Sequence, residues 1–347
     1  MKTTLSILAA LIMAGQLFAQ SPLAQAKPVG SVLWGYINPE GEFVIQPSYR
    51  ICNPFTEDGL APSTYDKSRK SFFFIQTDGE ELKTELDKFV LMNFKGFDPK
   101  GFRDGMAPVQ VKNDWGYMNT EGKLVVPAVY DKAREFDSNH GVVAKDKKFY
   151  IVDRTGNEKQ LDLLELVDVR RFSEGLAPIR VGAVWGFIST DGSVAIVPSF
   201  KSVGYFSEGM AWAKNTAGQT GFIDKKGNWV IEAKYETTKD FSNGLARVKS
   251  GNWTFVDKTG KTIATPSADS FGDFSDGLAY CKSAEKVGFI DKTGKLVIPQ
   301  EFSKVRDFKN GYAAAQQGEK WGFIDKTGKW AIEPKFDAVK DFEATTH

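Results

Sequence analysis

The chain has 347 residues, with 45 Lys and Arg against 44 Asp and Glu, which gives a formal net charge of +1. Hydrophobic residues make up 41% and charged residues 26%, proportions that are typical of a globular domain and exclude a disordered chain. The balanced charge excludes a polybasic nucleic-acid binder, and two cysteines are too few for a disulfide-dense scaffold.

The N-terminal segment has the layout of a secretory signal peptide. Lys2 precedes an apolar run from Leu5 to Phe18, which is shorter than the ~20 residues of a membrane-spanning helix. Ala24-Gln25-Ala26 then forms a small-x-small cleavage sequence, and Leu17-Phe18-Ala19 is an alternative, earlier one. We therefore predict a signal peptide over residues 1–26 and a single mature domain over residues 27–347.

Export would define where the mature protein works. We expect it in the periplasm, at the cell surface or outside the cell, with no transmembrane segment after cleavage. Removing Lys2 with the leader leaves no net charge, and hence no attraction to nucleic acid. Cys52 and Cys281 would meet an oxidising compartment; the sequence favours two buried thiols but leaves their pairing open.

One unit recurs nine times through the rest of the chain. Residues 321–329 read Trp-Gly-Phe-Ile-Asp-Lys-Thr-Gly-Lys, and close copies of this phrase begin at Trp253 and Val287. A second phrase, Phe-x-x-Gly-Leu-Ala or close to it, follows in every unit but the last, as at residues 172–177. A fixed period of about 34 residues is typical of repeat architectures. The units start near residues 34, 72, 115, 149, 185, 220, 253, 287 and 321.

Each unit is predicted to hold three or four short antiparallel strands. Large residues alternate in the opening phrase, and the following Asp-Lys-Thr-Gly sequence is typical of a hairpin turn. A second apolar strand, such as residues 296–298, often ends at a proline, which edge strands tolerate. A Val-x-x-Phe segment and a Leu-Ala-x-Val strand complete the unit. The sequence therefore predicts an all-β fold.

Three sets of glycines punctuate the units. We expect the hairpin glycine, present in all nine units, to adopt a left-handed conformation. A second set belongs to the Phe-x-x-Gly turns: residues 59, 105, 141, 175, 209, 244, 277 and 311. The third set follows the opening Trp, but Phe73, Tyr150 and Thr254 replace it in three units. A required positive φ is thereby excluded, and close packing between neighbouring units is predicted instead.

These phrases resemble the WG-repeat family, also called KWG repeats, of bacterial proteins. The resemblance covers residues 34–342, most strongly in units three and five to nine. It implies an all-β repeat array that serves in binding or as an appendage, usually without catalysis. It supplies no set of catalytic residues to place on this chain.

The repeats can form an open solenoid or a closed propeller-like ring. Propellers typically have four to eight blades of ~40–45 residues, so nine units of about 34 residues favour the solenoid. One feature supports the ring instead. The last unit stops at Phe342 without its Gly-Leu-Ala strand, while residues 29–33 precede the first Trp where such a strand would stand.

Catalytic and cofactor sites find little support. His140 stands beside a predicted turn, with no Cys or second His near it in sequence to build a metal site, and we expect no cofactor. The many Asp and Glu leave a carbohydrate-active hydrolase as an alternative, but they recur at predicted solvated turns. We therefore expect a non-catalytic protein.

A ligand site is predicted on the variable position of the Leu-Ala-x-Val strand. This column reads Pro62, Pro108, Ala144, Pro178, Trp212, Arg247, Tyr280 and Ala314. Because Pro, Arg and Ala occur in it, we expect an exposed edge on which Trp212, Arg247 and Tyr280 bind a partner. The competing interpretation is that these three side chains only cover apolar surface between units. The other Trp residues are assigned to the core.

A second candidate surface is the insertion near residues 80–100, which lengthens the second unit by about nine residues. The same lengthening also fits a drifted repeat with a longer loop. We thus predict an exported, non-catalytic binding or scaffold protein with a protein or glycan partner. The alternatives are a hydrolase and a purely structural spacer.

Overall fold

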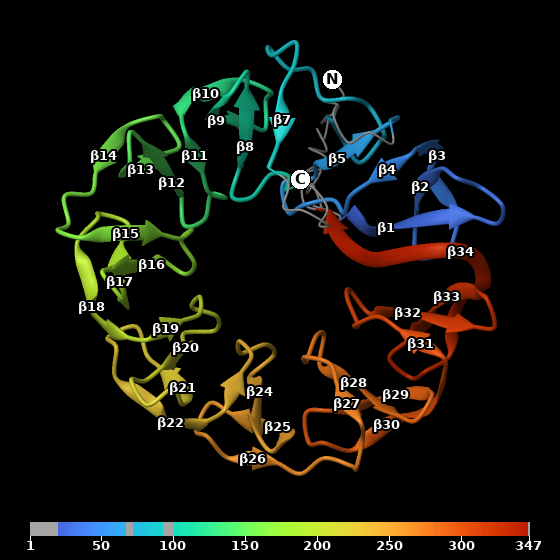
Figure 1. Ribbon diagram of the computed structural model, residues 1–347. Coiled ribbons are helices and arrows are strands. Elements are labelled where there is room, and N and C mark those ends of the chain that lie inside the picture. The colour runs from blue at the N-terminus through green and yellow to red at the C-terminus, as the bar shows by residue number, and fades with distance from the viewer. Residues whose placement is uncertain (1–19, 67–71, 93–99, 346–347) are drawn as a thin grey trace, which may run out of the picture.

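A computed structural model describes residues 20–66, 72–92 and 100–345, and these form a closed ring of small antiparallel sheets (Figure 1). No helix occurs in the described ranges. Eight sheets are present, and the seven-stranded one combines two neighbouring blades, so the described chain has nine blades. The all-β repeat fold is confirmed. Residues 1–19 of the predicted leader lie outside the described residues.

The strands have the following bounds in chain order. The first ten are β1 (Gln20–Pro28), β2 (Trp34–Ile37), β3 (Phe43–Tyr49), β4 (Ile51–Cys52), β5 (Ala61–Thr64), β6 (Phe73–Ile75), β7 (Val90–Leu91), β8 (Met106–Val111), β9 (Asp114–Asn119) and β10 (Leu124–Tyr130). The next twelve are β11 (Lys132–Ala133), β12 (His140–Lys145), β13 (Lys148–Asp153), β14 (Glu158–Gln160), β15 (Leu166–Val169), β16 (Leu176–Val181), β17 (Val184–Ser189), β18 (Val194–Phe200), β19 (Ser202–Val203), β20 (Ala211–Lys214), β21 (Thr220–Ile223) and β22 (Trp229–Tyr235). The last twelve are β23 (Thr237–Thr238), β24 (Leu245–Ser250), β25 (Asn252–Asp257), β26 (Thr262–Ile263), β27 (Ser270–Phe271), β28 (Leu278–Ser283), β29 (Lys286–Asp291), β30 (Leu296–Phe302), β31 (Lys304–Val305), β32 (Tyr312–Gln317), β33 (Lys320–Asp325) and β34 (Trp330–Thr345).

A sequence unit and a structural blade are offset by two strands. In the sheet β15-β16-β17-β18, the Trp-Gly strand β17 and the strand β18 come third and fourth. The next two strands of the same sequence unit, β19 and β20, begin the following blade. Each sequence unit therefore joins two blades, and the first blade needs strands from both ends of the chain.

The ring is closed by strand pairing between the two ends of the chain. β1 pairs antiparallel with β2 on one side and with the second half of β34 on the other, where Ala24 lies opposite Phe342. The hairpin glycine Gly41 also lies on Ile332 of the last blade, as Gly227 lies on Ile196. The favoured solenoid is therefore wrong, and the alternative ring is correct. The ring closes because β1 supplies the strand that the last sequence unit lacks.

The closing strand stands earlier in the sequence than predicted. Residues 23–26, Leu-Ala-Gln-Ala, form the Leu-Ala-x-Val strand, whereas residues 29–33 lie outside β1. Ala24 pairs with Ile37 as Ala313 pairs with Ile324, so the register is that of the other blades. The same residues that resemble a cleavage sequence are thus a strand of the repeat.

Aromatic pairs join neighbouring blades. Phe187 of β17 packs against Phe206, in the turn that precedes β20 of the next blade, with ring centroids 4.9 Å apart. Phe323 and Phe342 make the same contact at the closing interface, at 4.6 Å. These four rings are buried. Equivalent pairs are Tyr36–Phe55, Phe74–Phe102, Tyr117–Phe136, Phe222–Phe241, Phe255–Phe274 and Phe289–Phe308.

The tryptophans lie at the border of these cores. Trp185 is buried, but the other four Trp residues that open a unit (Trp34, Trp115, Trp253 and Trp321) are half-buried. Trp229 and Trp330 are also half-buried and pack edge-on against Phe200 and Phe302. The assignment of these Trp to the core is therefore confirmed for Trp185, whereas the half-buried ones pack against the cores from their borders: Trp34, Trp115, Trp229, Trp321 and Trp330. The Phe or Tyr two residues after each opening Trp takes the central place instead.

The glycine predictions are confirmed for the hairpins and for the Phe-x-x-Gly turns except at Gly141, and corrected for the set that follows the opening Trp. All nine hairpin glycines have φ between +80° and +89°. At Gly186, a Cβ would come within 2.6 Å of Pro198 N, so the close approach is to the next strand of the same blade and not to a neighbour. Gly141 is not a turn glycine: Ser138 and Asn139 hold the left-handed positions, and Gly141 lies against the Phe136 ring.

We expect Phe323→Ala to lower the free energy of unfolding by about 3–5 kcal/mol, because it leaves a cavity at the closing interface. Trp321→Ala should cost less, since that side chain is only half-buried. Chemical denaturation followed by circular dichroism measures both values. Val297→Ala, at an exposed rim position, serves as the control and should change stability by less than about 0.5 kcal/mol. Equal losses for Phe323 and Trp321 would contradict the central role of the Phe pair.

Candidate functional site

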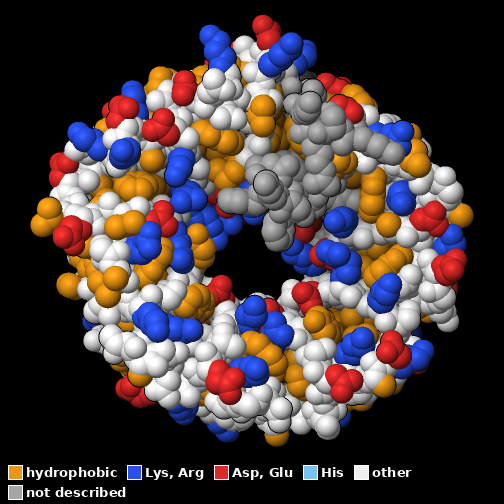
Figure 2. All heavy atoms as spheres, in the orientation of Figure 1, with side chains coloured by type: hydrophobic (Ala, Val, Ile, Leu, Met, Phe, Trp, Pro, Cys, Tyr) orange, Lys and Arg blue, Asp and Glu red, His pale blue; other side chains and the backbone are white. Residues whose placement is uncertain are grey.

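The inner wall of the ring is built from the Phe-x-x-Gly turns. The second half of β34 runs from the rim toward the middle, and β1 runs back beside it (Figure 1). The turn that follows the Phe of the Phe-x-x-Gly phrase therefore projects inward. Figure 2 shows an opening in the middle of the ring with charged side chains of both signs around it.

Hydrogen bonds link these turns from blade to blade. The Glu174 carboxylate accepts a hydrogen bond from the Gly209 backbone N–H at 3.0 Å and lies 3.2 Å from Lys225 Nζ, both of the next blade. Glu208 repeats this arrangement with Gly244 and Lys258. Asp276 repeats it with Gly311 and Lys326. These carboxylates therefore act as structural acceptors along the wall.

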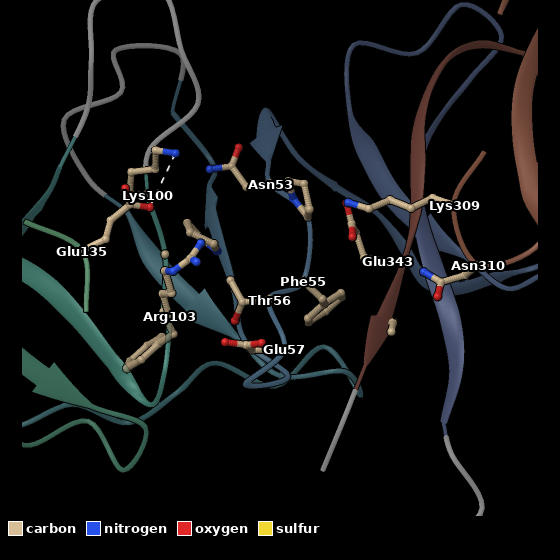
Figure 3. A pocket seen from close by; sticks show the side chains of 15 residues that line it. Asn53, Phe55, Thr56, Glu57, Lys100, Arg103, Glu135, Lys309, Asn310 and Glu343 are labelled. Atoms are coloured by element: carbon tan, nitrogen blue, oxygen red, sulfur yellow. Dashed lines mark hydrogen bonds and ion pairs between the residues drawn. The ribbon is translucent and has the colours of Figure 1, made fainter. Parts of the chain in front are cut away.

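A cavity of about 700 Å³ opens on this wall where five successive blades meet. Figure 3 shows Lys309 and Glu343 on one side of it, with Lys100, Arg103 and Glu135 on the other. Residues 53–57 lie between these two groups, in the turn of the second blade. The cavity thus brings together segments from the two ends of the chain.

Small residues create this space. Elsewhere the residue just before the turn Phe is Glu135, Arg171, Tyr205 or an Asp, but two of the blades that line the cavity have Pro54 and Gly101 there. Neither side chain extends far enough to fill the wall. Sequence analysis missed the cavity; the interruption of the acidic column at positions 54 and 101 was the available signal.

The charged side chains around the cavity form a network. Asp137 lies 2.6 Å from Arg103 and 3.5 Å from Arg171, while Glu135 lies 3.6 Å from Lys100. On the opposite side, Lys309 Nζ lies 2.6 Å from Glu343. Burial raises the pKa of Glu343, and Lys309 offsets part of that effect. The wall can therefore offer both cations and carboxylates to a ligand.

The structure places Trp212, Arg247 and Tyr280 in one column, but not on an exposed edge. All three are half-buried, and Pro62, Pro108, Ala144, Pro178 and Ala314 of the same column are buried. The expectation of an exposed edge is therefore wrong. The physical reason at two of these positions is that a large side chain fills space left by a glycine: Gly204 stands beside Trp212, and Gly272 beside Tyr280.

Each of the three also engages the next blade. Trp212 faces Asp240 and partly offsets the rise in the pKa of that carboxyl. Arg247 Nε lies 2.5 Å from Asp273 Oδ1, and its side chain is only 16% exposed. Tyr280 packs on the adjacent core cluster. The three residues thus cover apolar surface between blades, and a ligand-binding role for them stays a prediction.

A row of carboxylates that sequence analysis did not single out runs along the wall at Asp240, Asp273, Asp307 and Asp341. Desolvation, followed by the charge of Asp273, raises the pKa of Asp240. Desolvation, followed by Asp341 and Asp273, raises the pKa of Asp307. Arg306 forms a bidentate ion pair with Asp341, in which Nε lies 2.5 Å from Oδ1 and Nη2 lies 2.9 Å from Oδ2. The signal in the sequence was an Asp directly before the turn Phe in four successive units.

The insertion near residues 80–100 contributes side chains to the hydrophobic core between the second and third blades. Leu82, Leu86 and Phe89 pack against the buried cluster of the second and third blades, which fits a drifted repeat. A smaller cavity of about 410 Å³ lies beside it, lined by residues 87–90 together with Phe72, Gln110 and Lys112. Residues 93–99 of the insertion lie outside the described residues. Ligand binding there stays a prediction.

Within the described ranges, the cysteines form no disulfide and His140 belongs to no metal site. Cys52 and Cys281 are buried thiols in separate hydrophobic clusters. His140 is the first residue of β12, and its Nδ1 lies 2.8 Å from the Ser138 carbonyl oxygen. Among the residues that the structure describes, no group of three His, Cys, Asp or Glu could hold a metal ion. No described helix is long and apolar enough to cross a membrane.

A closed ring of antiparallel blades with a central opening defines a propeller-like β-repeat protein. Seven segments of the chain match the family described as WG containing repeat, and together they cover more than half of its length. The chain therefore belongs to this family. The matched residues are 34–62, 115–149, 185–216, 221–252, 253–282, 288–321 and 321–344.

Three solved structures are similar to this chain at low sequence identity, and the first of them shares its fold. A eukaryotic initiation factor is 10% identical with a TM-score of 0.63, and the match covers 92% of this chain and 97% of that one. The computationally designed protein Ika8 is 13% identical, with coverage of 79% and 93% and a TM-score of 0.44. BamB from Moraxella catarrhalis is 12% identical, with coverage of 66% and 85% and a TM-score of 0.37. A search of curated proteins found no match.

We expect Asp307→Asn to stabilise the protein at pH 7. The folded pKa of Asp307 is raised, so its ionised form opposes folding above that pKa, and this penalty disappears below about pH 4. The gain should be less than about 1 kcal/mol, because the partly desolvated side chain still contacts water, which screens its charge. Denaturant unfolding at pH 7 and pH 3.5 measures the difference between variant and wild type.

Asp291→Ala provides a control of opposite sign. The hydrogen bond from the Thr293 hydroxyl lowers the pKa of Asp291, so this carboxylate stabilises the fold above about pH 4 and the variant should be less stable at pH 7. A loss of stability in Asp307→Asn at pH 7 would contradict the conclusion that the neighbouring carboxylates repel one another in the folded protein.

Proposed function

We propose that this protein is an exported, non-catalytic binding protein that holds a segment of a partner protein in the cavity of the inner wall. The repeat β architecture is consistent with a non-catalytic binding or scaffold role. The observation that carries the proposal is the cavity of about 700 Å³ itself, a volume within the range of about 300–1,000 Å³ that ligand sites occupy.

The chemistry of the lining favours a peptide segment. Lys100, Arg103 and Lys309 present cations, while Glu57, Glu135 and Glu343 present carboxylates. A peptide can carry both positively and negatively charged side chains, which can pair with these groups. A neutral glycan instead packs on exposed aromatic faces. Phe55 and Phe102 at this site are buried, so they offer no such face. A glycan partner is the alternative.

A hydrolase finds less support in this arrangement. Glu174, Glu208 and Asp276 on the wall each accept a backbone N–H and face a Lys of the next blade. Such carboxylates are engaged in holding the blades together. We infer that the acidic residues of the turns serve the fold, and that the protein binds without transforming its partner.

Capture from envelope and spent-medium fractions tests the proposal. The immobilised wild-type protein is compared with Lys100→Glu/Lys309→Glu, in which two cations on opposite sides of the cavity are reversed. We expect the variant to retain at least tenfold less partner than the wild type. The control Lys132→Glu/Lys201→Glu makes the same charge change at two exposed positions away from the cavity lining and should capture normally.

Circular dichroism first shows that all variants are folded. Partner lost from the cavity variant alone supports the proposal, and treatment of the captured material with protease distinguishes a protein from a glycan. Equal capture by the cavity variant and the control would refute the cavity as the site. Trp212→Ala/Tyr280→Ala then tests the column predicted from the sequence.

A further inference from the structure

The strand that closes the ring overlaps the end of the predicted leader. β1 spans Gln20–Pro28, whereas a cut after Ala26 would place residues 20–26 in the leader. Within β1, the side chains of Leu23, Ala24, Gln25 and Ala26 are all buried, with exposed fractions of 6%, 0%, 1% and 0%. These residues are therefore part of the folded ring.

Removing them would open the ring at its closing interface. Ala24 lies opposite both Phe342 and Ile37, and Ala26 lies opposite Val339 and Gly35, so one strand holds the two ends together. Phe342 and Ile37 are fully buried in the same cluster as Ala24 and Ala26. A chain that began at Lys27 would expose this cluster to water and leave the edges of β2 and β34 unpaired.

We infer that the leader is removed between Ala19 and Gln20, so that the mature protein begins with the complete closing strand. This inference rests on the proposed export. The step is hydrolysis: water adds across the Ala19–Gln20 peptide bond, Ala19 leaves with a carboxylate and Gln20 gains a free α-ammonium group. Leu17-Phe18-Ala19 provides a small residue directly before the bond, and the Ala24-Gln25-Ala26 sequence is kept for folding.

The position of Gln20 gives the cut a second consequence. Gln20 pairs with Thr345, and the neighbouring Ala344 lines the cavity of about 700 Å³. The N-terminus that the cut creates at Gln20 therefore lies beside the candidate binding site, and the ring stays closed.

The mass of the exported product tests the inference. The full chain, with its own leader, is produced in a bacterial host, and the protein of the extracytoplasmic fraction is analysed by intact mass and N-terminal sequencing. We expect a single N-terminus at Gln20. An N-terminus at Lys27 would refute the inference while leaving export intact. A chain that stays in the cytoplasm with residues 1–19 attached would refute both export and the cut.

Matched chains that begin at Gln20 and at Lys27, each with one added Met and made without a leader, provide the second measurement. We expect the chain from Lys27 to melt at least about 10 °C lower than the chain from Gln20, or to lose its cooperative transition. The chain from Gln20 with Val297→Ala is the control for a harmless change and should melt with the wild type. Equal melting of the two truncated forms would overturn the need for β1.

Discussion

The ring depends on one repeated interaction, the aromatic pair that joins each blade to the next. Phe323 and Phe342 at the closing interface pack like Phe187 and Phe206 within the chain, with centroids 4.6 and 4.9 Å apart. Because the paired rings stand in successive blades, each contact sets the orientation of one blade relative to its neighbour. Where Ile151 replaces the first aromatic, it packs in one buried cluster with Phe172. Because this contact recurs at every interface of the ring, each blade is packed against a neighbour on both sides.

The offset between sequence unit and blade makes closure part of the same constraint. Since each unit begins with the third strand of a blade, the chain ends with the first strand of a blade whose second strand stands at the N-terminus. β1 fills this place and pairs with both β2 and β34. Closure thereby removes two exposed sheet edges, which are sites of aggregation in open sheets. The N-terminal strand thus has a structural role that its resemblance to a cleavage sequence conceals.

Departures from the repeat, and not the repeat itself, create the candidate site. Most turns carry a carboxylate that accepts the next backbone N–H, and most blades fill the wall with Arg, Tyr or Asp before the turn Phe. Pro54 and Gly101 interrupt that column and leave the space that Lys100, Glu135 and Lys309 surround. The regular blades make the ring rigid, and the irregular blades provide the cavity and the charged side chains that line it. This division explains why a repeat consensus says little about the ligand.

The sequence by itself determined the strands and turns, because short-range chemistry governs them: Gly260 and its equivalents take positive φ, and Asp257 caps its own hairpin. It also indicated which phrases repeat, and hence the all-β class and the nine units. Only the tertiary structure decided that Phe323 and not Trp321 is central, that Trp212 and Tyr280 fill space beside glycines, and that residues 23–26 close a ring. These outcomes depend on residues that lie one blade apart or at opposite ends of the chain. Local propensity does not register such pairings, since they arise only when all nine blades are in place.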